Sequence, residues 1–170
     1  MPLQTVFEAA VRQSRQVLVL GLGNAIASDD GAGVRALERL KNDSRLPPDA
    51  VLVDGGTACF ELLDVIAGAG RLVILDSVDT GAPPGTLVRM CGAELRGVPR
   101  GASAHELGLA DLLAASRLLG TEPAEVVLLG IQPASVAPGL ALSPAVESAL
   151  PALVEAALRE IGAARACEPT

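Results

Sequence analysis

Short apolar runs alternate with longer segments of helical period along the 170 residues of the chain. Apolar runs bounded by turn residues predict buried strands, and apolar positions three or four residues apart predict helices. The predicted strands cover residues 17–20, 51–53, 72–75, 86–90 and 126–131, and the predicted helices cover about 30–41, 60–67, 103–118 and 143–161. Such alternation is typical of a twisted, mostly parallel sheet with crossover helices, so the predicted fold class is α/β.

Two of the predicted helices carry start signals. Asp29 or Asp30 stands where the first helix needs an N-cap. Ser143 is the expected N-cap of the last helix, with Pro144 at its first position and Glu147 completing a cap-like start. The strand at 86–90 follows a Pro-Gly pair, which favours an edge position in the sheet and leaves its orientation open.

Length and hydropathy predict one compact domain. A content of 50% hydrophobic residues in 170 allows a sizeable core, and no apolar run reaches the roughly 18 to 20 residues that a membrane helix requires. Residues 1–16 lack the order of a secretory signal and are expected to form an N-terminal helix or arm. The single domain is expected at 17–163, with a tail at 164–170.

Charge and cysteine usage exclude some functions. The net charge is −7, and Phe7 and Phe60 are the only aromatic residues, so the chain lacks both the basic patch and the stacking platform that nucleic acids need. The chain has three cysteines, an odd number with no Cys-x-x-Cys spacing: Cys59, Cys91 and Cys167. Cysteines of this kind fit a reducing compartment, and we expect a cytoplasmic protein that does not insert in a membrane.

Acidic residues follow successive predicted strands. Asp29 and Asp30 come after the first strand, Asp54 after the second and Asp76 after the third, and the only histidine, His105, begins a later helix. Ligands in open α/β sheets bind beyond the carboxyl ends of the strands, so these groups are expected to converge at one edge. Taken singly, an Asp at these positions more often caps a helix or forms a turn.

Together, carboxylates and one neutral imidazole make an incomplete coordination set. This set suits borderline divalent ions such as nickel, zinc, manganese or iron, with positions left for water or substrate. A metal held in this way can polarise a carbonyl or lower the pKa of a bound water, which is hydrolytic chemistry.

Two other kinds of site compete with a metal site. Gly21-Leu22-Gly23 opens like a dinucleotide fingerprint, but Ile26 takes the place of its third glycine, so a nucleotide-binding module is the weaker alternative. Nucleophilic catalysis would need Ser103 or Cys59 to use His105 as base. We expect Ser103 to be an N-cap instead and Cys59 to be a core residue of the second helix.

Four ordered motifs resemble those of the hydrogenase maturation endopeptidases. The motifs are Gly21-Leu22-Gly23-Asn24 with Asp29-Asp30-Gly31-Ala32-Gly33, Asp54-Gly55-Gly56-Thr57, Leu75-Asp76 with Pro84-Gly85-Thr86, and His105-Glu106-Leu107-Gly108-Leu109. With Gly130-Ile131-Gln132-Pro133 included, the resemblance runs from about Val17 to Leu158. It implies a three-layer α/β/α fold and a peptidase that removes a C-terminal extension from the large-subunit precursor of a nickel-iron hydrogenase after nickel insertion.

The resemblance also assigns residues. Two acidic residues and one histidine contact nickel in the family, and by motif position these are Asp30, Asp76 and His105. The resemblance further implies that the nickel is carried by the precursor rather than held as a permanent cofactor. Asp29 is then the expected cap and Asp30 the expected ligand. A weaker hypothesis assigns peptide positioning to the turn formed by Asp54, Gly55, Gly56 and Thr57. The alternative within this setting is a non-catalytic, nickel-sensing assembly factor.

Overall fold

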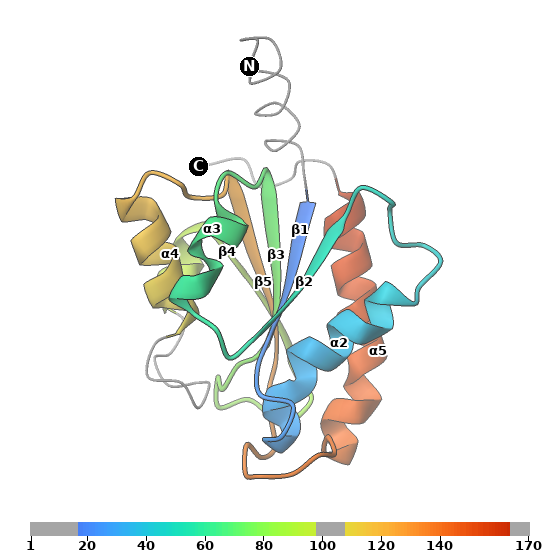
Figure 1. The fold of residues 1–170 in the computed structure, drawn as a ribbon. Coiled ribbons are helices and arrows are strands. Elements are labelled where there is room, and N and C mark those ends of the chain that lie inside the picture. The colour runs from blue at the N-terminus through green and yellow to red at the C-terminus, as the bar shows by residue number, and fades with distance from the viewer. Residues whose placement is uncertain (1–16, 98–107, 164–170) are drawn as a thin grey trace.

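A five-stranded sheet lies between two layers of helices in the computed structural model, which describes residues 17–97 and 108–163 (Figure 1). The strands are β1 (Val17–Leu22), β2 (Val51–Gly56), β3 (Arg71–Ser77), β4 (Leu87–Cys91) and β5 (Glu125–Ile131). The helices are α2 (Ala32–Lys41), α3 (Leu63–Ile66), α4 (Leu109–Leu118) and α5 (Pro144–Gly162), with 3₁₀ turns η1 (Ser28–Gly31), η2 (Phe60–Leu62) and η3 (Gly92–Gly97). The predicted α/β class and three-layer architecture are confirmed.

The sheet has the strand order β2-β1-β3-β5-β4. Strands β1, β2, β3 and β5 are parallel, whereas β4 pairs antiparallel with β5, beginning at Leu87 opposite Ile131. A turn returns the chain from β3 into β4, where the N–H of Gly85 donates to the carbonyl of Gln132 (2.8 Å) and that of Thr86 to the carbonyl of Pro83 (3.1 Å). The edge position expected of this strand is confirmed, and its orientation is antiparallel.

Each face of the sheet carries its own core. Helices α2 and α5 cover one face, where Leu37, Leu40 and Leu150 pack with Val73 and Leu129 of the strands. Helices α3 and α4 lie on the other face (Figure 1). Buried strand residues alternate between the two cores because successive side chains of a strand point to opposite faces. Within the described ranges, no helix has the length and hydropathy needed to cross a membrane.

The predicted cap of the first helix is wrong. Residues Ser28–Gly31 form the 3₁₀ turn η1, the N-cap of α2 is Gly31, and no side chain caps either element. The carboxylates of Asp29 and Asp30 accept hydrogen bonds from other parts of the chain instead. These longer-range amide donors compete with the local cap, and the sequence around the helix does not reveal them.

The cap of the last helix is confirmed in part. Ser143 accepts a hydrogen bond from the N–H of Val146 (3.4 Å), and Pro144 occupies the first helical position. Glu147 does not complete the cap, because its carboxylate pairs with the guanidinium of Arg39. The N–H of Ser143 donates to Asp29 instead (2.6 Å).

Other predicted boundaries shift by a few residues. Strand β2 extends to Gly56, so Asp54 lies inside the strand rather than beyond it. The second predicted helix divides into η2 and the short α3. Cys59 is the N-cap residue of η2 and is half-buried, so it is not a core residue within the helix as predicted. Helix α4 begins at Leu109, and the earlier start expected at 103–106 lies outside the described residues.

Glycines allow the start of α2 to touch the ends of β1 and β3. A Cβ atom on Gly33 would lie 2.2 Å from the carbonyl oxygen of Leu75 and 2.4 Å from that of Leu22. Gly23 has a φ of +118°, and a Cβ atom there would lie 1.8 Å from the carbonyl oxygen of Asp30. This close approach of backbone to backbone brings η1 against the strand ends.

Replacing Gly33 with alanine is expected to destabilise the protein by about 3 kcal/mol, because the new methyl group meets two backbone carbonyls that cannot rotate away. Gly162 is the matched control, since a Cβ atom there has no neighbour within 4 Å. Gly162→Ala should change the free energy of unfolding by no more than about 1 kcal/mol, in the stabilising direction. Urea denaturation of both variants measures the difference, and equal stabilities would contradict this account of the packing.

Candidate active site

Two buried carboxylates, Asp30 and Asp76, meet beyond the carboxyl ends of β1 and β3. Asp30 in η1 has no exposed surface, and Asp76, the second-last residue of β3, is 8% exposed. Ser77 contacts both: its N–H donates to Oδ1 of Asp76 (2.8 Å) and its hydroxyl donates to Oδ1 of Asp30 (3.3 Å). The other oxygen of Asp30 accepts the N–H of Asn24 (2.7 Å). Two of the three predicted ligands are therefore brought together.

The carboxylate pair is electrostatically unfavourable when both members are ionised. Burial, and then the negative charge of Asp30, raise the pKa of Asp76 to about 7, and the hydrogen bond from the N–H of Ser77 offsets only part of this rise. A cation next to the pair would stabilise both ionised carboxylates and displace the proton from Asp76. The donor set, two hard oxygen ligands in a buried corner, fits a divalent metal.

His105, the third predicted ligand, lies outside the described residues. Within residues 17–97 and 108–163, no three ligating side chains form a metal cluster. The assignment of His105 therefore stays a prediction.

Asp54 does not join the carboxylate pair. Its side chain is exposed, and Oδ1 accepts the N–H of Gly56 (3.0 Å), so Asp54 forms the turn that an Asp-Gly sequence commonly forms. The carbonyl of Gly56 accepts the N–H of Gly23 (2.8 Å), which joins this turn to the loop after β1. Asp54, Gly55, Gly56 and Thr57 thus lie beside the candidate site without a ligand role.

Asp29 holds the loop after β5 against η1. Its carboxylate accepts three backbone hydrogen bonds, from Ala134 (2.8 Å), Ser135 (3.2 Å) and Ser143 (2.6 Å). Burial alone would raise the pKa of Asp29, but these hydrogen bonds outweigh it and leave the pKa below its usual value of 3.8. Asp29 is therefore an ionised structural group, whereas Asp30 is the carboxylate that lies with Asp76.

Two buried polar residues of this edge, Ser77 and Gln132, had no role assigned from the sequence. Ser77 directly follows a strand-end acid, which is its only sequence signal. Gln132 is 5% exposed; its Oε1 accepts the N–H of Thr80 (2.7 Å) and its Nε2 donates to Oδ1 of Asp79 (2.9 Å). Gln132 ties the loop after β3 to the end of β5, and a polar residue directly after an apolar strand was the signal for it.

The geometry disfavours a phosphate site in the turn after β1. A phosphate cradle needs free backbone N–H groups. Here the N–H groups of Gly23, Asn24, Ile26, Ala27, Ser28, Asp29 and Asp30 all donate to acceptors within the protein.

A cysteine nucleophile is disfavoured too. The thiol of Cys59 donates to the carbonyl of Gly108 (3.7 Å). Burial, and then the charges of Asp111 and Glu61, raise the pKa of this thiol, so it stays protonated at neutral pH and is a poor nucleophile. Ser103, the other candidate nucleophile, lies outside the described residues.

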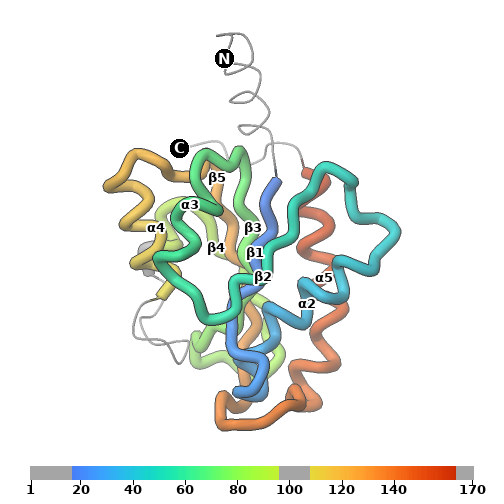
Figure 2. The backbone as a smooth tube through the Cα atoms, viewed as in Figure 1, coloured from blue at the N-terminus to red at the C-terminus, as the bar shows by residue number. Residues whose placement is uncertain are grey.

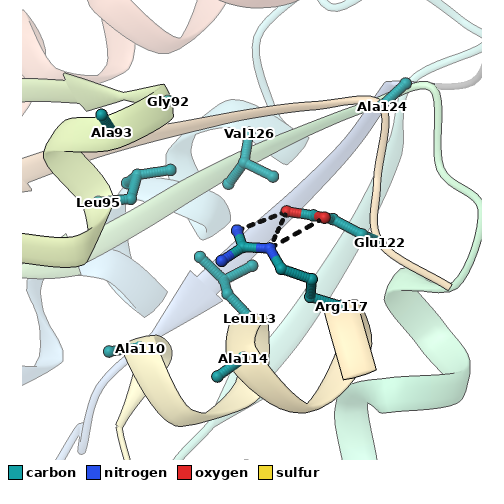
Figure 3. A pocket seen from close by; sticks show the side chains of 10 residues that line it. All are labelled: Gly92, Ala93, Leu95, Ala110, Leu113, Ala114, Arg117, Glu122, Ala124 and Val126. Carbon is teal, nitrogen blue, oxygen red and sulfur yellow. Dashed lines mark hydrogen bonds and ion pairs between the residues drawn. The ribbon is translucent and has the colours of Figure 1, made fainter. Parts of the chain in front are cut away.

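A cavity of about 720 Å³ lies elsewhere, between η3, α4 and the start of β5 (Figure 3). Arg117 and Glu122 form an ion pair on its wall (2.7 Å), and Leu113 and Val126 also line it. Val126 pairs with Leu72 at the beginning of β3, whereas Asp76 pairs with Gly130 near the end of the two strands. The cavity is therefore at the opposite end of the sheet from the carboxylate pair.

Comparisons with known proteins show which family the chain belongs to. The family model described as hydrogenase maturation protease matches residues 34–160. The hydrogenase 2 maturation protease of Escherichia coli is 41% identical over 152 residues, which are 86% of this chain and 93% of that protein. The chain belongs to the hydrogenase maturation protease family. It is a hydrogenase maturation peptidase, as its endopeptidase relatives are.

Solved structures extend the similarity to the fold of the protease. The hydrogenase maturating endopeptidase HybD from E. coli superposes with a TM-score of 0.79 at 38% identity, covering 86% of this chain and 94% of that one. The [NiFe] hydrogenase maturation protease HybD from Thermococcus kodakarensis gives a TM-score of 0.69 at 29% identity, covering 86% and 99%. A further relative found by sequence, the hydrogenase expression/formation protein HupD of Rhodobacter capsulatus, is 37% identical over 87% of this chain and 72% of that protein.

Asp29→Asn is expected to destabilise the protease by about 2 to 3 kcal/mol at pH 7, because an amide replaces a charged acceptor of three buried N–H groups. The lowered pKa of Asp29 stabilises the fold above about pH 4, and this contribution is lost as the pH falls through the folded-state pKa. The difference from wild type should therefore shrink toward pH 3. Urea titrations at both pH values test this, with the exposed Asp49→Asn as control.

Asp76→Asn should have the opposite effect on stability in metal-free protein. The raised pKa means that wild type loses stability as the pH rises from about 3.8 to about 7, where folding requires a buried charge. Asparagine cannot ionise, so the variant should be more stable than wild type at pH 8, by a few kcal/mol. The gain should be smaller at pH 5. A gain that does not change with pH, measured by urea denaturation, would contradict the assigned ionisation.

Proposed function

We propose that this peptidase removes the C-terminal extension from the large-subunit precursor of a nickel-iron hydrogenase after nickel has been inserted. Nickel carried by the precursor is recognised by Asp30, Asp76 and His105. The observation that carries the proposal is the buried Asp30–Asp76 pair at the carboxyl edge of the sheet, in a member of the hydrogenase maturation protease family.

The charge of this pair gives a physical reason for nickel dependence. Because burial and Asp30 disfavour the charge of Asp76 and raise its pKa to about 7, this carboxyl is only partly ionised near neutral pH. A divalent ion brought by the precursor replaces the remaining proton, so a nickel-loaded precursor gains an attraction that a nickel-free precursor lacks. A divalent ion held here can polarise a carbonyl or lower the pKa of a bound water.

Ser77 and Asn24 keep the pair ready for the ion. Both N–H groups, with the hydroxyl of Ser77, hold the carboxylate oxygens in fixed directions before the substrate arrives. Groups oriented in advance need little rearrangement when a charge enters.

The turn at Asp54, Gly55, Gly56 and Thr57 is proposed to position the substrate peptide. Asp54 and Thr57 are exposed beside the site, and the turn is held in place by the hydrogen bond from Gly23 to Gly56. The cytoplasmic location expected from the cysteines stays a prediction.

Asp76→Asn and His105→Ala are expected to lower cleavage of nickel-loaded precursor by at least about 100-fold, because each removes a ligand of the ion that triggers cleavage. Mass spectrometry of the precursor, incubated with each variant, measures the loss of the C-terminal peptide. Wild type should leave nickel-free precursor uncut.

Asp64→Asn is the matched control, since Asp64 is an exposed carboxylate of α3, which packs on the face of the sheet opposite to α2. This variant should cleave at the wild-type rate. Unimpaired cleavage by Asp76→Asn or His105→Ala would reject the ligand assignment. Binding of the loaded precursor by wild type without release of a peptide would support a non-catalytic assembly factor instead.

A further inference from the structure

Two loops at the edge of the carboxylate pair carry large exposed aliphatic side chains. Ile26, in the loop after β1, is 64% exposed, and Val136 and Leu140, in the loop after β5, are 42% and 73% exposed. The two loops lie side by side at the same end of the molecule (Figure 2). We call Ile26, Val136 and Leu140 the apolar loop patch.

Hydrogen bonds hold the two loops together. The N–H of Gly139 donates to the carbonyl of Ile26 (2.9 Å), the N–H of Ser28 donates to the carbonyl of Gly139 (2.8 Å), and the hydroxyl of Ser28 donates to the carbonyl of Ala137 (2.9 Å). The guanidinium of Arg35 in α2 donates to the carbonyl of Leu140. The exposed side chains therefore stand on backbone fixed from both loops and from a helix, which lowers the entropy lost when a partner binds.

The loops contain no charge. Residues 16–28 and 126–146 lack Asp, Glu, Lys and Arg altogether, in a chain that is 19% charged. Exposed aliphatic groups on uncharged, preformed loops are typical of a site that contacts another protein. These three side chains belong to neither hydrophobic core, so core packing does not explain why they are apolar.

We propose that the apolar loop patch docks the folded body of the large-subunit precursor, next to the segment that is cleaved. This inference rests on the proposed function. A precursor whose nickel reaches Asp30 and Asp76 must also cover the loop after β1, because Asn24 of that loop binds Asp30 and Ile26 follows only two residues later. The patch is thus continuous with the surface that the substrate has to touch, and it recognises an apolar area around the base of the extension.

The size of the patch favours a transient substrate over a second copy of this chain. Stable dimers commonly bury more than about 1,200 Å² of total surface, which is far more than three side chains supply. A substrate that is already held by its nickel and its extended peptide needs only a small further contact. The patch then supplies affinity for the precursor whether or not nickel is present.

The double variant Ile26→Ser, Leu140→Ser tests this inference with the full-length protein. Its affinity for purified precursor should fall about tenfold or more, because two large apolar side chains no longer leave water on binding. The loss should be the same for nickel-loaded and nickel-free precursor. KM for cleavage of loaded precursor should rise by a similar factor, with kcat unchanged.

Leu118→Ser is the matched control, because Leu118 is 89% exposed at the end of α4, away from the carboxylate pair. It should leave the affinity and KM unchanged. Asp76→Asn should differ from the double variant by losing only the part of the affinity that depends on nickel. Thermal unfolding checks that all variants remain folded.

Equal affinities of wild type and the double variant for the precursor would overturn the docking inference and leave the proposed function standing. Failure of wild type to cleave nickel-loaded precursor would instead reject the proposed function, and the affinity measurement would still decide docking. Sedimentation analysis provides the remaining outcome: a wild-type dimer that the double variant dissociates would assign the patch to a second copy and overturn the inference.

Discussion

The close contact between η1, the start of α2 and the ends of β1 and β3 is the constraint on which the site depends. Gly23 and Gly33 leave no room for a Cβ atom, so backbone lies directly against backbone at this point. The contact places Asp30 next to Asp76 at a depth that water scarcely reaches. A larger residue at either glycine would move η1 outward and separate the two carboxylates.

Adjacent acids have different functions because their hydrogen-bond partners differ. Asp29 accepts hydrogen bonds from three backbone N–H groups, which stabilise its charge and hold the loop after β5 in place. Asp30 and Asp76 share Ser77, and their like charges oppose each other in a buried place. The repulsion between the two buried carboxylates is therefore what would favour a cation beside them, and perturbed pKa values of this kind are common at functional sites.

The same hydrogen bonds that build the site shape the surface around it. Asp29, Ser28 and Arg35 attach the uncharged loop after β5 to the loop after β1, and that attachment presents Ile26 and Leu140 to solvent. The proposed ligand groups and the proposed docking surface thus belong to one hydrogen-bonded unit at the carboxyl edge of the sheet. The cavity beside Arg117 is at the other end and is independent of this unit.

Local pattern was sufficient to predict the strands, the α/β class, the edge position of β4 and the Ser143 cap, because each depends on residues close together in the chain. The placement of acids at successive strand ends also pointed to Asp30 and Asp76, since parallel strands bring their carboxyl ends to one edge. Only the tertiary structure showed that Asp29 binds amides more than one hundred residues away, that Asp54 serves its own turn, and that Ser77 joins the two buried acids. These outcomes depend on which donors the folded chain brings within about 3 Å of each carboxylate, and sequence spacing carries no information about such distant partners.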